Sequence, residues 1–194
     1  MSVIDMHLHI KYRSRCSNLS LDDLYNNISD RFDAVCITDH WKINPLLYNP
    51  FVDKPLFLGV EVTSTMGDIL AYGVRSVPLK NKHLLAENLI DYIHRQGGIA
   101  VCAHPFSNRH DGFEDHVYAY DFDAIEINGA LDKKYHKMAE SAANEMDVAL
   151  IGGSDAHSIS QLNTIGTQFD IPINSIEDII KTVKNKMCNP IRII

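Results

Sequence analysis

Short apolar runs alternate with amphipathic segments along the whole chain. Seven runs have the length and composition of buried strands, at residues 2–8, 34–38, 55–62, 69–74, 99–103, 124–127 and 148–152. Two weaker runs follow at 165–171 and 191–194. Patterns typical of amphipathic helices lie between them, at 20–30, 84–96, 133–146 and 175–186. This alternation predicts an α/β fold with a mainly parallel sheet.

Ligand-type or polar side chains stand at the ends of most of the predicted strands. In chain order they are Asp39, His40, Glu61, His104, Glu126, Asn128, Asp155 and His157. The ends of distant strands could not meet at one point in an open sheet, whereas in a barrel all strand ends surround one mouth. The pattern therefore favours a barrel of about seven strands, smaller than the usual eight.

The first run carries three groups that do not suit a buried strand. Because side chains alternate along a strand, Asp5, His7 and His9 point to the same side. Two imidazoles beside a carboxylate are suited to a divalent metal. The alternative is a pair of hydrogen-bonded histidines in an ordinary strand, and this motif alone does not separate the two interpretations.

Composition limits the remaining alternatives. A chain of 194 residues with 45% hydrophobic and 22% charged residues is expected to form one domain, 1–194. The net charge of -7 argues against a general nucleic-acid binder. No run approaches the ~20 apolar residues of a membrane span. The four cysteines form no C-x-x-C pair, so we expect a reduced, cytoplasmic protein; they are Cys16, Cys36, Cys102 and Cys188.

Five motifs occur in an order that resembles a known family. They are Asp5-x-His7-x-His9, Thr38-Asp39-His40, Gly59-Val60-Glu61, Ala103-His104-Pro105 and Ser154-Asp155-Ala156-His157. Together they resemble the polymerase and histidinol phosphatase (PHP) family of metal-dependent phosphoesterases, over roughly residues 3–158. The resemblance implies a distorted seven-stranded (β/α)7 barrel. It also implies two or three divalent metals (zinc, manganese or iron) and hydrolysis of a phosphoester.

The resemblance also assigns roles to individual residues. One metal would be held by His7, His9, Glu61 and Asp155, and Glu61 would bridge to a second that also takes His104. A third would lie between His40 and His157. Asp39 would stand behind the ligands or handle a proton, and Asp5 would orient a ligating histidine. Glu126 and Asn128 are expected as further polar partners behind the ligands.

At two positions the chain departs from the family's usual pattern. Many members place Asp or His a few residues after the His-x-His motif, where this chain has Ser14-Arg15-Cys16-Ser17. Cys16 or no residue would fill that role in the third site. Many members also carry a histidine after the glycine that follows the glutamate, where this chain has Asp68. Because a carboxylate still ligates a metal, the second site is expected to be complete.

The residues suggest a hydrolytic reaction on their own. Two metals bridged by a carboxylate can hold a hydroxide that attacks phosphorus, and they neutralise charge in the transition state. Asp39 and His157 are both candidates to protonate the leaving oxygen, with Glu61 as the catalytic bridge. Five cationic side chains in loops after strands are candidates for binding substrate phosphate: Lys11, Arg13, Arg15, Lys42 and Arg109. The alternative for each of them is an ordinary solvent-exposed loop charge.

Three functions remain open. The leading hypothesis is a phosphoesterase acting on a small phosphorylated substrate, either a monophosphate or a short nucleotide. The second is a non-catalytic nucleic-acid-binding subunit, similar to the ribonuclease P protein whose barrel has lost the metal residues. The third is an exonuclease-like or proofreading module that acts beside a polymerase. Retention of seven ligand-type residues argues against the second. Oligomeric state is not predicted.

Overall fold

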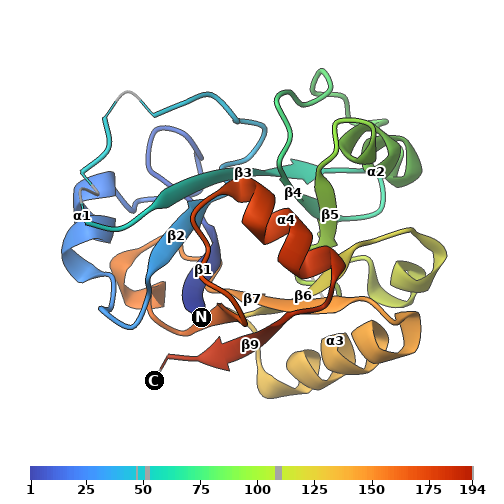
Figure 1. The fold of residues 1–194 in the computed structure, drawn as a ribbon. Coiled ribbons are helices and arrows are strands. Elements are labelled where there is room, and N and C mark those ends of the chain that lie inside the picture. The colour runs from blue at the N-terminus through green and yellow to red at the C-terminus, as the bar shows by residue number, and fades with distance from the viewer. Residues whose placement is uncertain (47, 51–52, 108–110, 194) are drawn as a thin grey trace.

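The strands of the protein form one strongly curved sheet that wraps into a barrel (Figure 1). The computed structural model describes residues 1–46, 48–50, 53–107 and 111–193. The order of the strands is β7-β6-β5-β4-β3-β2-β1-β8-β9. Their bounds are β1 Ser2–Leu8, β2 Ala34–Ile37, β3 Leu56–Thr63, β4 Asp68–Tyr72, β5 Ile99–Cys102, β6 Ala124–Asn128, β7 Ala149–Gly153, β8 Ile165–Phe169 and β9 Cys188–Arg192. The helices are α1 Leu21–Asn27, α2 Ala86–His94, α3 Lys133–Met146 and α4 Ile176–Lys184, with short 3₁₀ turns η1 Glu114–Ala119 and η2 Ile159–Gln161.

The predicted α/β class is confirmed, but the predicted seven-stranded (β/α)7 barrel is wrong in its strand count. The described residues form nine strands, with four parallel and four antiparallel neighbouring pairs. β4 runs antiparallel to both neighbours because residues 64–67 turn the chain straight back without a helix. The Ser64 hydroxyl closes this turn, accepting from the Gly67 N–H and donating to the Gly67 carbonyl. The two weaker C-terminal runs become β8 and β9, which are also antiparallel.

A narrow seam brings β7 back against β1 and β8. The seam is held by a parallel bridge between Leu8 and Ala156 and by the Asp155 N–H, which donates to the His7 carbonyl at 2.7 Å. Two glycines allow this approach because they have no side chain. A Cβ at Gly152 would lie 2.5 Å from a carbonyl oxygen of β8, and one at Gly153 would lie 2.7 Å from the His7 nitrogen. The barrel is therefore nearly closed, although β7 is not part of a regular ladder on this side.

Helix α4 covers the end of the barrel opposite to the motifs (Figure 1). Ser175 and Asp178 form a capping box at its start, which satisfies backbone groups of the first turn. Ile179 and Val183, four residues apart on one face, pack into the same buried cluster as residues of β1, β4, β5 and β7. Apolar side chains therefore fill the interior of the barrel at this end, and the parallel strands finish at its other end.

The sequence predicts no membrane span and no disulfide bond. Among the described residues, no helix combines the length and the apolar composition needed to cross a membrane. All four cysteines are free thiols, and only Cys16 is exposed.

Candidate metal centre

The eight predicted metal ligands converge at the mouth of the barrel. They form three groups in which the candidate ligand atoms lie within 4.8 Å of one another: His7 with His9 and Asp155, Glu61 with Asp68 and His104, and His9 with His40 and His157. Six of these side chains are buried, and His40 and His157 are about one-third and one-quarter exposed. The two exposed imidazoles place the third group nearest to solvent.

Glu61 stands at the centre of the three groups. Its Oε1 lies 3.2 Å from Nε2 of His104, and its Oε2 lies 3.2 Å from Nε2 of His9 and 3.1 Å from Nδ1 of His40. Burial alone would raise the pKa of this carboxyl, but the positive charge of His7 and hydrogen bonds from the imidazoles hold it well below its usual value. Glu61 is therefore ionised and can bridge between neighbouring cations.

The two histidines of β1 have their Nδ1 atoms occupied behind the cluster. His7 Nδ1 lies 2.7 Å from Oε1 of Glu126, and His9 Nδ1 lies 3.2 Å from the Ser14 hydroxyl. The Ser14 hydroxyl donates its single proton to Asp39 at 2.7 Å, so towards His9 it acts as an acceptor. Both imidazoles thus carry the Nδ1 proton and present Nε2 to the cluster, which is the arrangement of a histidine that binds a metal.

The Nε2 atoms of His7 and His9 face each other at 3.0 Å. Two imidazole lone pairs at this distance repel unless a proton or a cation lies beside them. Asp155 Oδ1 lies 3.5 Å from Nε2 of His7 and 3.4 Å from Nε2 of His9. The three atoms form one corner of the cluster with negative partial charge. The charges of Glu126, Asp155 and Glu61 overcome the effect of burial and raise the pKa of His7 well above its usual value. The metal-free corner therefore binds a proton in a place suited to a divalent cation.

The second group contains two buried atoms without a hydrogen-bond partner in the described part of the chain, Asp68 Oδ1 and His104 Nδ1. Unpartnered buried polar atoms are costly, so their presence points to a missing ligand. Burial, and then the Glu61 charge, raise the pKa of Asp68 to about 7. For His104 burial acts in the opposite direction, but its hydrogen bond to Glu61 prevails and raises its pKa to about 9. These donors fit a divalent metal.

Two of the candidate ligands have a backbone conformation that side chains disfavour. His104 has φ of 29° and Asp155 has φ of 54°, in the left-handed region. Each residue follows a strand that ends at the mouth, β5 and β7, and the unusual turn directs its side chain towards the cluster rather than along the strand. Such strain persists where the surrounding structure fixes it, and it concentrates at functional sites.

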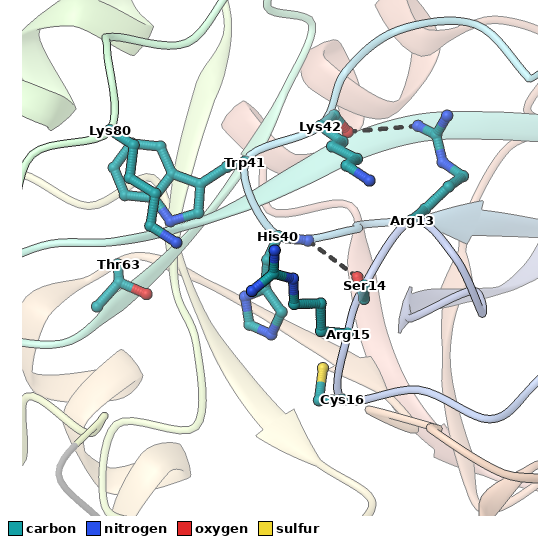
Figure 2. Close-up of a pocket in the computed structure, with 9 residues that line it drawn as sticks. All are labelled: Arg13, Ser14, Arg15, Cys16, His40, Trp41, Lys42, Thr63 and Lys80. Atoms are coloured by element: carbon teal, nitrogen blue, oxygen red, sulfur yellow. Dashed lines mark hydrogen bonds between the residues drawn. The ribbon is translucent and has the colours of Figure 1, made fainter.

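A cavity of about 560 Å³ opens beside the third group (Figure 2). His40 forms one wall, and four cationic side chains, Arg13, Arg15, Lys42 and Lys80, also line the cavity. No acidic residue is among its lining residues in the described structure. A cavity with this lining, next to candidate metals, favours an anionic ligand.

Comparison with known proteins gives a family match at the C-terminal part of the chain. A family model described as PHP-associated matches residues 133–188, which extend from α3 to the beginning of β9. Four of the five motifs precede this segment and the fifth, at residues 154–157, lies inside it, so the match and the motifs together extend from residue 5 to residue 188. This match supports the resemblance to the PHP family that the motifs carry.

Several individual proteins are similar to this chain. An uncharacterised protein of Methanocaldococcus jannaschii is 28% identical over 148 residues, which cover 69% of this chain and 82% of that protein. The structure of PsfC from Pseudomonas syringae aligns with a TM-score of 0.72 at 19% identity, covering 98% of this chain and 91% of PsfC.

Two further structures have descriptions that name an activity. A candidate metal-dependent phosphoesterase from Bifidobacterium adolescentis has a TM-score of 0.60 at 14% identity, covering 80% of this chain and 87% of that one. An amidohydrolase from Chromobacterium violaceum, with bound sulfate and no metal, has a TM-score of 0.59 at 17% identity, covering 79% and 87%. At these identities the likeness shows a shared fold.

Asp39, predicted to stand behind the ligands or to handle a proton, has both carboxylate oxygens engaged in hydrogen bonds. Oδ1 accepts from the Ser14 hydroxyl at 2.7 Å and from the Ile10 N–H at 2.8 Å, and Oδ2 accepts from Arg13 Nε at 2.6 Å. The same guanidinium reaches the Asn44 carbonyl at 2.9 Å. Arg13 therefore ties two loops of the mouth together while it lines the cavity.

The residues predicted to lie behind the ligands contact different parts of the site. Glu126 contacts the His7 ring, and its second oxygen accepts from the His104 N–H at 2.9 Å and from the Asn128 amide at 3.1 Å. Asp5 does not reach a ring: its Oδ1 accepts from the backbone N–H groups of His7 at 3.2 Å and Ser154 at 2.9 Å. Asp5 therefore holds the seam between β1 and β7.

Only some of the remaining predicted residues line the cavity. Arg15 and Cys16 line it, but Cys16 is in none of the three ligand groups found among the described residues. Lys11 does not line the cavity, and its ammonium lies 5.2 Å from the Tyr12 ring centroid. Arg109 falls outside the residues that the structure describes.

Sequence reasoning missed four residues at the mouth: Ser14, Trp41, Lys80 and Asp111. Asp111 Oδ1 lies 3.9 Å from His104 Nδ1. Trp41 directly follows the Thr38-Asp39-His40 motif, and this position was the available signal. No sequence signal marked Lys80, because this residue lies in the loop after β4. The end of β4 points away from the mouth.

Proposed function

We propose that this protein is a metal-dependent phosphoesterase that hydrolyses a small phosphorylated substrate. One observation carries the proposal: Glu61 contacts a histidine of each of the three groups of metal-type ligands, and His40 of the third group lines a cavity together with four cations. The metal-type ligands suit hydrolysis, and the cations suit an anionic substrate. The candidate phosphoesterase of similar fold supports the same assignment, and the amidohydrolase of similar fold supports hydrolysis in general.

The proposed cofactors are two or three divalent ions of zinc, manganese or iron. His7, His9, Glu61 and Asp155 would hold the first, and Glu61, Asp68 and His104 the second. His40 and His157, with His9, would hold the third, which has no carboxylate of its own beyond the shared Glu61. When bound, the ions would supply Lewis-acid charge and an activated water. Nitrogen and carboxylate ligands accept all three metals.

The protein's own side chains perform the other tasks. The guanidinium of Arg15 and the ammonium of Lys42 face the cavity and would bind the phosphoryl oxygens. As the oxygen of water bonds to phosphorus, the ester P–O bond breaks and the leaving oxygen takes up a proton. His157 is one-quarter exposed and can supply that proton in a molecule that holds only the first two metals, whereas both oxygens of Asp39 are occupied. The proposal therefore makes Asp39 a positioning residue.

Phosphate release is the measurement that tests the proposal. Protein freed of metal with a chelator is supplied separately with zinc, manganese or iron(II), and para-nitrophenyl phosphate is the substrate. We expect turnover only after metal is restored. Glu61→Gln keeps the side-chain size but removes the bridging charge, so we expect a loss of ~100-fold or more. Glu145→Gln, on the exposed side of α3, is the matched control and retains full activity.

Two results would overturn the proposal. The first is an unchanged rate in Glu61→Gln, because the reaction would then not depend on the cluster. The second is hydrolysis of an acyl anilide by the metal-loaded protein with no release of phosphate from aryl phosphates or short oligonucleotides. That second result would favour amide hydrolysis on the same fold.

A further inference from the structure

We propose that Trp41 and Lys80 recognise the leaving group of the substrate, and that this group is planar and carries a negative charge of its own. The inference rests on the proposed phosphoesterase function and names the class of substrate: an aryl-type phosphoester with a second anionic group. It assigns a specificity-determining role to two residues that no motif identifies.

Trp41 is fixed next to the candidate metal ligands. It follows His40 directly, and its own N–H donates to the Glu61 carbonyl at 2.9 Å. Its φ of 59° lies in the left-handed region, which a large side chain adopts only when its surroundings impose it. Part of the indole packs against the buried cluster outside the barrel, while the rest lines the cavity. The ring is thus held rigidly at a set position relative to Glu61.

A second cavity extends the first beyond Trp41. This second space, of about 350 Å³, shares Trp41, Thr63 and Lys80 with the cation-lined cavity. It also contains Asn81 and Lys82. A substrate whose phosphoryl group lies at His40 would therefore pass the indole before it reaches the second space. Together the two cavities reach the size range of ordinary small-molecule sites.

Lys80 supplies the charge for the second anionic group. Its ammonium lies 5.8 Å from the centroid of the Trp41 ring, and Figure 2 shows it beside the indole on the cavity side. Lys80 is exposed and forms no ion pair with a carboxylate in the described part of the chain. No acidic residue is among those that line either cavity. An indole face with an adjacent unpaired cation suits a flat, negatively charged group.

Non-hydrolysable phosphonates measure this recognition without turnover. We would titrate zinc-loaded protein with methylphosphonate, phenylphosphonate and para-carboxyphenylphosphonate by calorimetry. Trp41 is the only tryptophan, so quenching of its fluorescence reports directly on a ring placed against it. We expect affinity to rise by about tenfold on adding the ring and by severalfold more on adding the carboxylate.

Variants separate the two contributions. Trp41→Leu should abolish the advantage of the phenyl ring, whereas Trp41→Phe should restore most of it. Lys80→Met should abolish only the advantage of the carboxylate. Lys184→Met, exposed on α4 at the opposite end of the barrel, removes the same charge and should change nothing. Metal content is measured in each variant, because a purely structural role of Trp41 would lower metal binding along with affinity for all three phosphonates.

The outcomes for the two proposals are distinguishable. If the ranking of phosphonates holds but no phosphate ester is hydrolysed, leaving-group recognition stands as a binding property and the phosphoesterase function fails. If aryl and alkyl phosphates are hydrolysed with equal kcat/KM and the variants alter neither, the function stands and this inference is overturned. Equal affinities for the three phosphonates in the wild-type protein would also overturn it.

Discussion

Oε1 of Glu126 lies 2.7 Å from Nδ1 of His7, and Oε2 of the same carboxylate accepts the His104 N–H at 2.9 Å. One buried carboxylate therefore sets the ring of one candidate ligand and the backbone of another, although it belongs to none of the three ligand groups among the described residues. Carboxylates in this position raise the basicity of a ligating imidazole and fix its tautomer.

We predict that Glu126→Gln weakens metal binding by about 10–100-fold. The amide can still accept from His7, but its NH₂ group must then face the donors of His104 and Asn128, which the carboxylate satisfied. Competition with a chromogenic chelator measures the change. Glu145→Gln is the control, and equal affinity in both variants would contradict the role given to Glu126.

Ser14→Ala should impair both metal binding and stability. It removes the acceptor that fixes the His9 tautomer and one donor to the buried Asp39. Loss of a donor to a buried acceptor lowers the free energy of unfolding by about 1–3 kcal/mol. Urea unfolding of the metal-free protein measures the stability loss, and calorimetry measures the metal affinity. Ser158→Ala, whose hydroxyl bonds only near η2, should alter neither.

Metal affinity should rise with pH up to about 9. In the metal-free protein the pKa of Asp68 is about 7 and that of His104 about 9, and a metal must displace these protons. Binding should therefore release about two protons from this pair at about pH 6 and about one at about pH 8. Calorimetry in buffers of different ionisation enthalpy counts them, and a proton release that does not vary with pH would contradict the assignment.

The same pKa values predict the stability of the metal-free protein. Both pKa values lie above the ordinary values of 3.8 for Asp and 6.5 for His, so the folded state binds these protons more tightly than the unfolded chain. The contribution of Asp68 is complete below pH 3.8 and is lost by about pH 7, and that of His104 is complete below pH 6.5 and is lost by about pH 9. Urea midpoints of the metal-free protein should fall across this range, and saturating metal should flatten the fall.

Two metals should be held firmly and a third weakly. The third group has three imidazoles, two of them partly exposed, and only the shared Glu61 as an acid. Burial raises the pKa of the Cys16 thiol, which opposes thiolate ligation. We therefore expect Cys16→Ser to leave the metal content unchanged. Elemental analysis after dialysis decides this, and loss of one equivalent in the variant alone would assign Cys16 to the third metal.

Gly153→Ala should affect the barrel seam and the metal centre together. The added Cβ would lie 2.7 Å from the His7 nitrogen, so β1 and β7 must separate. Overpacking of this kind costs about 1–3 kcal/mol, and it also displaces a candidate ligand. Gly97→Ala is the control: its φ of 82° makes alanine unfavourable, but no atom lies within 4 Å of its Cβ. It should lower stability alone, with metal affinity unchanged.

The sequence located the candidate ligands because each lies in a short motif where a strand ends. His104 and Asp155 could thus be placed at one mouth without knowledge of the side-chain contacts. The direction of β4 could not be read in the same way, because an apolar run looks alike in both directions. The short spacing around Ser64 and Gly67 was the available sign of a hairpin, since a parallel crossover needs a dozen residues or more.

Residues that act through tertiary contacts were harder to predict. Ser14 resembles an ordinary loop serine until Asp39 and His9 are seen on either side of it. Lys80 leaves the far end of β4 in a long loop that returns to the mouth, where the Leu84 carbonyl accepts the Thr65 N–H at 2.8 Å. No local sequence pattern in residues 73–85 indicates that this loop returns to the mouth.

The incomplete ladder beside β7 has a consequence for the protein in a cell. Elsewhere in the barrel neighbouring strands are joined by regular ladders, whereas the seam has only a short backbone bridge beside His7, His9 and Asp155, whose side chains are suited to a shared ion. A cation there would act as a cross-link between β7, at one end of the sheet, and β1. By mass action, free metal at about 100 times its dissociation constant would add about 2.7 kcal/mol to the unfolding free energy. Metal supply would therefore govern how long each molecule survives proteolysis, as well as its activity.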